Sequence, residues 1–473
     1  MVAGVAIAAL TVGQAVSQPT RSISQSERAQ GAQAHPQLLE EFGGTYNGPQ
    51  AGYVRQVGQR IAAQSGLSNS PSDFTISLLN SPVNNAFAIP GGYVYITRQL
   101  MALANDEAEL ASVMGHEVGH VAAQHASKRS RTATISGIGA AILGVLTGSS
   151  QVAQLASQAS QLYTLRFSRA QEYEADDLGI QYLTRAGYDP AASSRLLASL
   201  AAQSALDNRV ANRDARTVPT WASTHPDPAS RVTRAAQRAA ATGRRGGLTN
   251  RDAFLNAVDG TLYDDDPRQG VIDGQTFRHP DLRLAFTAPN GFTMANSPQA
   301  VTVSGSGAQA QFSGGGSSGG DLRDYVERVF AALAGNQRLP VGEVLTTTVN
   351  GIPAAYATAR ANTQSGPVDA TVFAYAFEPN RTYHFVILAP AGRGLGPLAS
   401  LVGSVRRLSS AEAASIRPRR VDVVTVTRND TVASLSARMA YSTYRTERFL
   451  TINGLRANDR LVPGQRVKLV VFG

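Results

Sequence analysis

Two histidines four positions apart, the first followed by a glutamate, constrain this sequence more than any other feature. They lie in VMGHEVGHVAAQH, residues 113–125 of a chain with 7 histidines among 473 residues. Residues four apart on a helix share a face, so His116 and His120 can both reach one metal ion. Glu117 is then placed to take a proton from a metal-bound water, whose pKa the metal lowers. The pattern predicts a helix lining a site for one Zn²⁺ per chain; the alternative is a solvated helix with incidental histidines.

A catalytic zinc site needs a third protein ligand. His125 lies about 140° round the helix from the second ligand histidine, so we expect it at the surface. The metzincin class would need glycine at position 123 and histidine at 126, and this chain has alanine at both. Residues 121–171 contain no aspartate or glutamate, which makes Glu172 the first carboxylate after the motif. Glu172 is therefore the expected third ligand.

Further carboxylates follow Glu172 in FSRAQEYEADDLG. Asp176 shares its helix face, whereas Glu174 points about 200° away. We expect Asp176 to accept the Nδ1–H of a ligand histidine, because ligand histidines usually donate that hydrogen to a carboxylate. The alternative for Glu172 is a surface acid paired with Arg169.

The stretch STHPDPASR holds two more candidates, His225 and Arg231. A histidine before proline in a turn often only caps or packs. The functional interpretation makes His225 a catalytic residue that hydrogen-bonds the oxyanion or gates the metal, since loops carry much of protein function. Arg231 is expected to bind Asp176 or Asp177.

Two apolar segments bear on localisation. VAGVAIAALTVGQAVS, within residues 1–17, has the small residues that precede a signal-peptidase cut and predicts an export signal, with a buried or membrane-anchoring helix as the alternative. Residues 132–148 are apolar and Gly-rich but shorter than the roughly 20 residues of a membrane span. A flap, a buried helix or an interfacial segment is favoured there.

Composition limits the partners. The net charge is +9, but the arginines are scattered without an aromatic-interleaved basic run, which argues against nucleic-acid binding. Anionic membrane or wall polymers stay open, including peripheral membrane contact. The chain has no cysteine, which excludes disulfides and thiolate zinc sites.

A chain of 473 residues should contain two to four domains. We predict an α+β multidomain protein. Its first domain, residues 38–245, is mainly helical with a small sheet, and a polar, flexible stretch precedes it. Residues 276–408 alternate strand-like runs with a helix and predict a separate α+β domain of unassigned role, with a flexible loop at 313–320. A short module occupies residues 421–473.

Four ordered stretches, NNAFAIPGGYVYIT, HEVGH, SRAQEYEAD and HPDPASR, resemble one family of zinc peptidases over about residues 40–240. That family includes the CAAX prenyl proteases, the HtpX-like heat-shock proteases and the periplasmic beta-barrel-assembly-enhancing protease. The resemblance implies a gluzincin-type domain in which His116, His120 and Glu172 bind zinc and Glu117 is the catalytic base. It also makes His225 a regulator of latency.

The same resemblance implies that the strand after the Pro-Gly-Gly turn is the edge strand that aligns substrate. Gly92, Tyr93, Val94 and Tyr95 are then the expected substrate-binding residues. This chain lacks the several long apolar segments of the membrane-embedded members, which disfavours prenyl substrates. It also lacks the helical-repeat tail of the barrel-assembly protease.

The last module is similar to LysM domains, which bind N-acetylglucosamine glycans of peptidoglycan. The similarity rests on a strand–helix–helix–strand pattern with Asn-Gly-Leu and Pro-Gly-Gln landmarks in residues 421–473. Asn429 stands where glycine is usual. Glycan binding and a non-binding structural copy are both open.

These observations predict an exported zinc metalloendopeptidase, periplasmic or envelope-associated, that cleaves unfolded or misassembled envelope proteins. The main alternative is a wall-associated chaperone or adaptor with a latent metal site. A third is a protease held at the membrane by an uncleaved N-terminal helix and residues 132–148.

Overall fold

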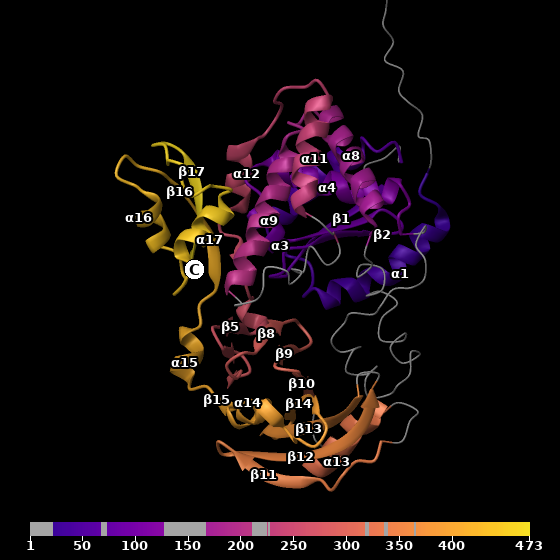
Figure 1. Cartoon of the computed structure of the whole chain (residues 1–473), viewed down its shortest axis with the longest axis vertical. Coiled ribbons are helices and arrows are strands. Elements are labelled where there is room, and N and C mark those ends of the chain that lie inside the picture. The colour runs from indigo at the N-terminus through magenta and orange to yellow at the C-terminus, as the bar shows by residue number, and fades with distance from the viewer. Residues whose placement is uncertain are drawn as a thin grey trace, which may run out of the picture.

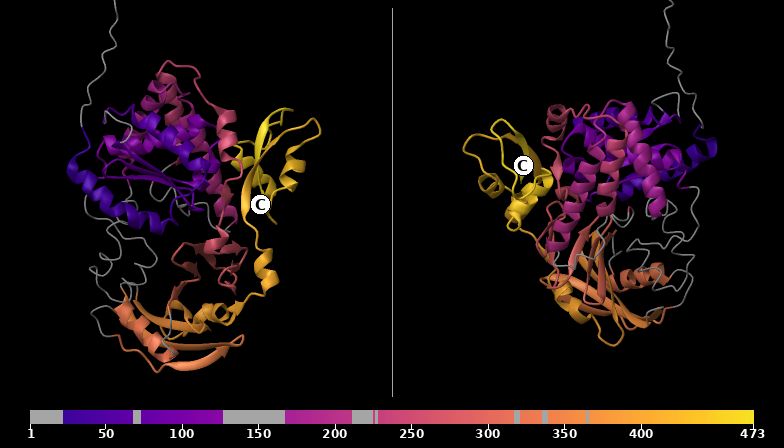
Figure 2. Two further views of the ribbon diagram at one scale, coloured as in Figure 1. Left: turned by 180° about the vertical axis from the view of Figure 1, so that it is seen from behind. Right: turned by 45° about the horizontal axis from the view of Figure 1, so that its top comes forward.

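The computed structural model describes residues 22–67, 73–126, 167–210, 225, 228–316, 321–334, 339–363 and 366–473. The segments 1–17 and 132–148, for which an export signal and an interfacial segment were predicted, lie outside these ranges. In the part of the chain that is described, no helix has the length and apolar character needed to cross a membrane. Figures 1 and 2 show a helical N-terminal domain, a sheet-rich central domain below it and a C-terminal module beside the first domain. The prediction of an α+β multidomain protein is confirmed at this level.

A three-stranded sheet organises the N-terminal domain. Its order is β1 (Thr75–Leu79), β3 (Tyr93–Thr97) and β2 (Ala86–Ile89), with β1 parallel to β3 and β2 antiparallel to it. Helix α1 (Gln25–Glu41) covers one face, packing Leu38 and Ala34 against Phe87 and Tyr95. The other face packs against α2 (Pro49–Ala62) and α4 (Glu107–Ala122). The polar stretch expected to be flexible is thus a helix from Gln25, and Ser24 and Glu27 cap it reciprocally.

The helices complete the domain around α4. They are α3 (Arg98–Leu103), α8 (Arg169–Arg185), α9 (Ala192–Val210), α11 (Pro228–Ala241) and α12 (Arg251–Val258). Asp106 caps α4 by accepting the Glu109 N–H at 2.8 Å, which fixes the start of the helix. The alternative of a solvated helix with incidental histidines is wrong, because every residue from Glu107 to His120 is buried and other elements surround α4.

Two sheets and a helix form the central domain. The smaller sheet has the order β15-β7-β6-β5 and the larger one β11-β12-β13-β14-β10-β9-β8. Helix α13 (Leu322–Ala334) covers one face of the larger sheet, and aromatic residues fill the space between its other face and the smaller sheet. The strands are β5 (Val271–Asp273), β6 (Thr276–His279), β7 (Leu284–Thr287), β8 (Thr293–Asn296), β9 (Val301–Gly305), β10 (Ala308–Gly315), β11 (Leu345–Val349), β12 (Ile352–Thr363), β13 (Gly366–Glu378), β14 (Arg381–Pro390) and β15 (Arg406–Arg407).

Short helical turns η2 (Pro267–Gln269) and η3 (Gly396–Leu398) and helix α14 (Ala399–Gly403) complete this domain. The strands begin at Val271, slightly before the predicted start. Part of the loop expected at 313–320 is regular structure, since β10 continues to Gly315 by pairing with β14.

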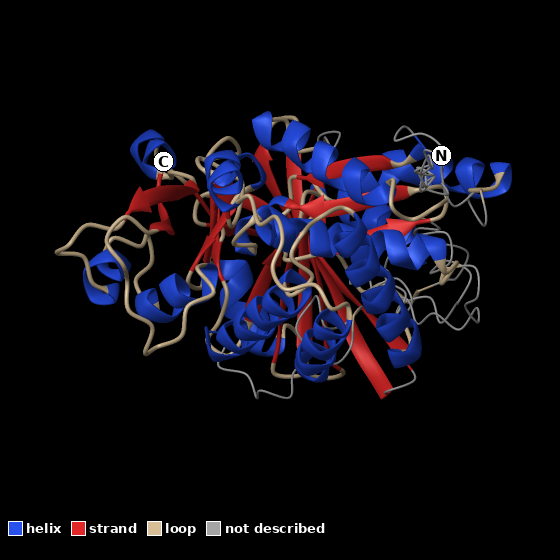
Figure 3. Ribbon diagram, turned by 90° about the horizontal axis from the view of Figure 1, so that it is seen from above, coloured by secondary structure: helices blue, strands red, loops and turns tan. Residues whose placement is uncertain are grey.

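The C-terminal module has the predicted strand–helix–helix–strand order. Helix α15 (Ser410–Ser415) leads into β16 (Arg419–Thr425), α16 (Val432–Ala437), α17 (Arg445–Ile452) and β17 (Arg466–Phe472). β16 pairs antiparallel with β17, and β4 (Leu262–Tyr263) adds to the other edge of β16. Seen from above in Figure 3, the module lies at one side of the molecule. Because β4 directly follows the N-terminal domain in sequence, the module's sheet is joined to that domain by backbone hydrogen bonds.

Candidate metal centre

Glycines let α4 and α8 approach closely enough to share a site. A Cβ placed on Gly115 would lie 3.1 Å from the Gly179 Cα, and one on Gly119 would lie 3.0 Å from the Ala175 carbonyl oxygen. Side chains at these positions would push the helices apart. The backbone contact therefore brings the histidines of α4 against the carboxylates of α8.

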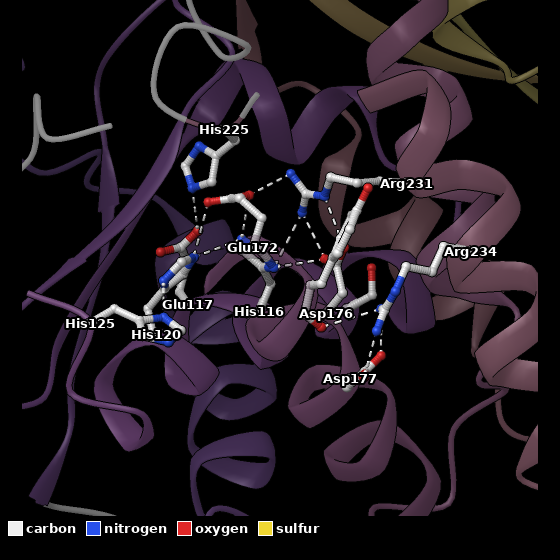
Figure 4. Close-up of polar contacts among 12 residues, drawn as sticks. His116, Glu117, His120, His125, Glu172, Asp176, Asp177, His225, Arg231 and Arg234 are labelled. Carbon is white, nitrogen blue, oxygen red and sulfur yellow. Dashed lines mark hydrogen bonds and ion pairs between the residues drawn. The ribbon is translucent and has the colours of Figure 1, made fainter. Parts of the chain in front are cut away.

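Four buried side chains converge at this contact, as Figure 4 shows. The His116 and His120 Nε2 atoms are 3.0 Å apart, and the Glu172 oxygens lie 3.6 Å and 3.5 Å from them respectively. His225 completes the group, whose potential ligand atoms all lie within 4.8 Å of one another. Ligands at about 2.0–2.1 Å in a tetrahedron are about 3.3 Å apart. The observed spacing fits a small ion in tetrahedral coordination.

The carboxylates have oxygens that a cation would satisfy. The Glu172 Oε1 and the Glu117 Oε2 are buried without a hydrogen-bond partner among the described residues. Buried polar atoms are nearly always hydrogen-bonded or bound to an ion, so orphaned ones need an explanation. The residues present therefore fit a metal ion, held by two imidazoles and a carboxylate.

A charged network holds the first histidine in place. The His116 Nδ1 lies 2.9 Å from the Asp176 Oδ1. Arg231 binds Asp176 through two nitrogens at 2.7 and 2.8 Å and also contacts Glu172 at 2.6 Å. Burial opposes ionisation of Asp176, but the Arg231 cation outweighs it and holds the pKa of this carboxyl well below its usual range. The arginine thus positions both a ligand carboxylate and the carboxylate that orients a ligand histidine.

The second histidine has a partner that the sequence did not predict. The His125 Nδ1 lies 2.8 Å from the His120 Nδ1, and the His125 Nε2 lies 3.1 Å from Glu174. His125 is 1 % exposed, so the prediction of a surface residue was wrong. Helix α4 ends at Ala122, and Gln124 adopts a left-handed φ of 55°, which turns the chain back toward the site. Counting angles round a continuing helix does not apply beyond that turn.

His225 and Glu117 face each other across the cluster, with 3.4 Å between the His225 Nε2 and the Glu117 Oε1. Burial disfavours the Glu117 carboxylate, but the hydrogen bond from His225 and the neighbouring imidazoles outweigh it and lower the pKa of Glu117. Glu117 is therefore ionised at neutral pH, the form that accepts a proton. His225 is close enough to the histidine pair to act as a fourth ligand.

Comparison with known proteins agrees with this geometry. Residues 49–239 match the profile of the family described as "Peptidase family M48". These residues form an M48 peptidase domain. The resemblance predicted from the four sequence motifs is confirmed over this part of the chain.

Named relatives share the M48 region. The "Beta-barrel assembly-enhancing protease" of Yersinia pestis is 34% identical over 198 residues, 40% of this chain and 38% of that protein. The "Mitochondrial metalloendopeptidase OMA1" of Schizosaccharomyces pombe is 30% identical over 212 residues, 44% of this chain and 59% of that protein. "Metalloprotease LoiP" of Escherichia coli is 36% identical over 110 residues, 23% of this chain and 43% of that protein. This chain thus spans about two fifths of the Yersinia relative.

The predicted substrate strand of the M48 domain is not an edge strand. Tyr93 to Thr97 form β3, which lies between β1 and β2, so both of its backbone edges are hydrogen-bonded. Tyr93 and Tyr95 pack under α1, where the Tyr95 hydroxyl contacts the His35 Nδ1 at 2.8 Å. Val94 is fully buried in the core, and Gly92 occupies the turn with a φ of 81°. The structure does not bring these four residues to the metal cluster.

The two edge strands of this sheet are β1 and β2. Thr45 bridges to Leu79 of β1, whereas β2 packs against α4. The sequence does not reveal β2, because the four residues of AFAI are all apolar and show no alternation of polar and apolar side chains.

Proposed function

We propose that this chain is a zinc-dependent metalloendopeptidase. The observation that carries the proposal is the buried group of His116, His120, Glu172 and His225 with the Glu117 carboxylate beside it. Imidazole and carboxylate ligands in tetrahedral spacing suit zinc, which binds such ligands at about 2.0–2.2 Å. The names of the M48 relatives, a protease and a metalloendopeptidase, support the same activity.

The residues divide the work of peptide hydrolysis between them. His116, His120 and Glu172 would hold zinc, which supplies Lewis acidity to the scissile carbonyl and to a water. Glu117, ionised and within the cluster, accepts the proton of that water and delivers it to the leaving amine. Arg231 and Asp176 keep His116 and Glu172 oriented throughout.

The position of His225 supports a metal site whose access to water is regulated. Catalytic zinc sites have three protein ligands and an open fourth position. His225 lies among the potential ligand groups and contacts Glu117, so it would occupy the fourth position when zinc is bound. Its withdrawal would open that position to water and release the carboxylate. We therefore assign His225 as a gate, the second of the two roles its sequence context suggests.

The substrates proposed are extended segments of unfolded or misassembled envelope proteins. An extended peptide can add to the outer edge of β2 through backbone hydrogen bonds, which read conformation more than sequence. The relatives named for beta-barrel assembly support action in the bacterial envelope. Peptidoglycan binding by residues 421–473 and peripheral membrane contact are further proposals, resting on the LysM-like element order and the net positive charge.

The test is digestion of an unfolded protein such as casein by the zinc-loaded full chain. We expect cleavage by the wild type and none by Glu117→Gln, with zinc content equal in the two proteins. Glu378→Gln is the matched control, which should cleave like the wild type, because Glu378 is a half-exposed carboxylate of β13 outside the M48 domain. Cleavage by Glu117→Gln would contradict the proposal.

His225 also favours a second candidate, the binding protein with a latent site. A full set of four protein ligands is typical of structural zinc, which does no chemistry. The variant His225→Ala separates the two readings. Cleavage gained in His225→Ala and lost again in the double variant with Glu117→Gln would establish a gated peptidase. Inactivity of the wild type and of His225→Ala would favour the chaperone or adaptor.

A further inference from the structure

A buried lysine of the C-terminal module reaches into the M48 domain. Lys468 lies on β17, is fully buried, and is one of two lysines in the chain. Its Nζ donates to the carbonyl oxygens of Ala102, Leu103 and Ala104 at 2.7, 3.4 and 2.5 Å. These residues end helix α3, directly before the metal-binding helix α4.

The contact requires a long side chain with hydrogen-bond donors at its end. The last carbonyls of a helix have no partner within the helix, and they carry its negative end. Burying a lysine is costly unless its charge and its donors are matched. At the end of α3 the three carbonyls match the donors of Lys468, and although burial lowers the pKa of Lys468 to about 7, the Glu109 and Asp106 carboxylates favour its charged form. A side chain without a donor would leave the three carbonyls without this partner.

The module holds Lys468 rigidly. The Asn453 side chain accepts the Lys468 backbone N–H at 2.7 Å and donates to its carbonyl at 2.8 Å, as a neighbouring strand would. This asparagine begins the Asn-Gly-Leu landmark. Gly454, with a φ of 60°, fits so closely that a Cβ there would lie 3.1 Å from the Asn105 Nδ2. The landmark thus packs against the corner between α3 and α4.

A second set of hydrogen bonds, from the first residue of α12, joins the module to the M48 domain. Arg251 donates to the Asn105 carbonyl at 2.6 Å and to the Arg466 carbonyl of β17 at 3.0 Å. One guanidinium therefore joins the α3–α4 corner to the same strand that carries Lys468. The two ties fix the corner from both sides.

The corner in turn sets the start of α4. The Asn105 N–H donates to Glu109 at 2.9 Å, and Arg195 pairs with both Asp106 and Glu109. Ten residues, or about 15 Å of helix, separate Asp106 from the ligand His116. Since Gly115 packs on the backbone of α8, a shift of α4 would move His116 relative to Glu172.

We propose that the C-terminal module sets the position of the metal-binding helix through β17, with Lys468 as the positioning residue. Whatever displaces β17 would alter the metal site, which makes the module a control element for the peptidase. The effect on hydrolysis rests on the proposed function. The effect on metal binding does not.

The experiment compares Lys468→Met with Val467→Ala in the full chain. Val467 is also fully buried on β17 but points to the opposite face of the strand, so its truncation weakens the module without touching the corner. Both proteins are first checked by circular dichroism and thermal unfolding. Zn²⁺ affinity is then measured by competition with a chelator, and the visible spectrum of bound Co²⁺ reports ligand geometry.

We expect Lys468→Met to bind Zn²⁺ roughly 3- to 30-fold more weakly than the wild type, the range typical of coupling through packed networks. Its Co²⁺ spectrum should shift, while Val467→Ala should match the wild type in both measurements. Wild-type metal binding by folded Lys468→Met would overturn the inference, as would equal weakening in both variants. A chain that binds metal normally but cleaves nothing would contradict the proposed function and leave this result intact.

Should Lys468→Met fail to fold, Arg251→Gln tests the same corner through its second tie. Arg251 is partly exposed, so this change removes two hydrogen bonds without burying an unmatched group. A weaker Zn²⁺ affinity in Arg251→Gln supports the inference, and an unchanged one overturns it.

Discussion

At the scale of single residues, the chain from Glu174 through His125 to His120 decides how the second imidazole faces the metal. His125 lies within hydrogen-bond distance of the Nδ1 of His120, so it fixes which nitrogen is left for a ligand bond. Burial and the neighbouring His116 hold the pKa of His120 well below its usual value. The ring is therefore neutral at physiological pH, as a metal ligand must be.

Replacing His125 by phenylalanine retains the ring volume and removes the contact to His120. We expect Zn²⁺ affinity to fall by roughly 10- to 100-fold, the usual effect of losing a hydrogen bond that supports a ligand. Chelator competition at pH 7.5 measures this. Glu174→Gln should have a smaller effect, because the Glu174 side chain is 55% exposed and water can replace it. Unchanged affinity in His125→Phe would show that the contact does not orient the ligand.

Residue spacing predicted the histidine pair, Glu117 and Glu172, because each rests on helix periodicity or on the absence of other carboxylates. Residue spacing could not predict the position of His125, because that position depends on one left-handed residue after the helix end. His225 is brought to the cluster by tertiary packing alone. Sequence motifs marked it as a candidate without fixing which of two roles it has.

At the scale of elements, the pairing of α4 with α8 is the feature that makes the site. A Cβ on Gly179 would lie 3.0 Å from the backbone of Gly115 and His116. Backbone atoms cannot yield as a flexible side chain can. The two helices would separate, and the Glu172 carboxylate would move away from the histidines.

Gly179→Ala is therefore expected to destabilise the M48 domain by about 1–3 kcal/mol, the usual cost of overpacking, and to weaken Zn²⁺ binding. The matched control is Gly52→Ala in α2, where a Cβ meets no atom within 4 Å. That change should stabilise the helix by about 0.5–1 kcal/mol. Thermal unfolding with and without zinc compares the two. Equal behaviour of both variants would show that the glycine contact is not tight.

Strand existence was predictable from alternation in DFTISLL and YVYIT, but strand order was not. Order depends on which elements pack on each face, and α1, the helix that covers Tyr93 and Tyr95, was expected to be flexible. Its moderate polarity hides the small apolar stripe that docks on the sheet. The edge strand that packs against α4 is therefore β2, a strand of only four residues.

At the scale of the whole molecule, composition shifts located the three parts of the chain without showing how they meet. Linker sequence near Leu262 and Tyr263 becomes β4 and pairs with β16, more than 150 residues later. The buried Lys468 could not be anticipated, because lysines are rarely buried. Such contacts form only when the domains pack together, so local sequence patterns do not predict them.

The junction between the M48 and central domains contains an acid, Asp265, that burial makes harder to ionise. The Asp265 carboxylate accepts the Ile272 N–H of β5 at 2.8 Å and lies 3.4 Å from the Asn296 Nδ2 of β8. Burial raises the pKa of Asp265 to about 6, and the neighbouring Asp264 adds to the rise. The folded protein therefore binds a proton here that the unfolded chain releases between about pH 3.8 and 6.

The sign of the pH effect follows from that difference. Stability falls as the pH rises from about 3.8 to about 6, and the full penalty, about 1–3 kcal/mol, is present above pH 6.

Asp265→Asn keeps an oxygen for the Ile272 N–H and cannot ionise. We expect it to stabilise the protein fully at pH 8, by roughly half as much at pH 5, and not at all below about pH 3.8, where the acid is protonated in both the folded and unfolded states, as measured by urea unfolding followed by circular dichroism. Asp273→Asn, at an exposed acid of β5, is the control and should show no such pH dependence. A stabilisation by Asp265→Asn that is equal at pH 8 and below pH 3.8 would mean that ionisation of Asp265 does not weaken the junction, and that its hydrogen bonds alone determine its contribution.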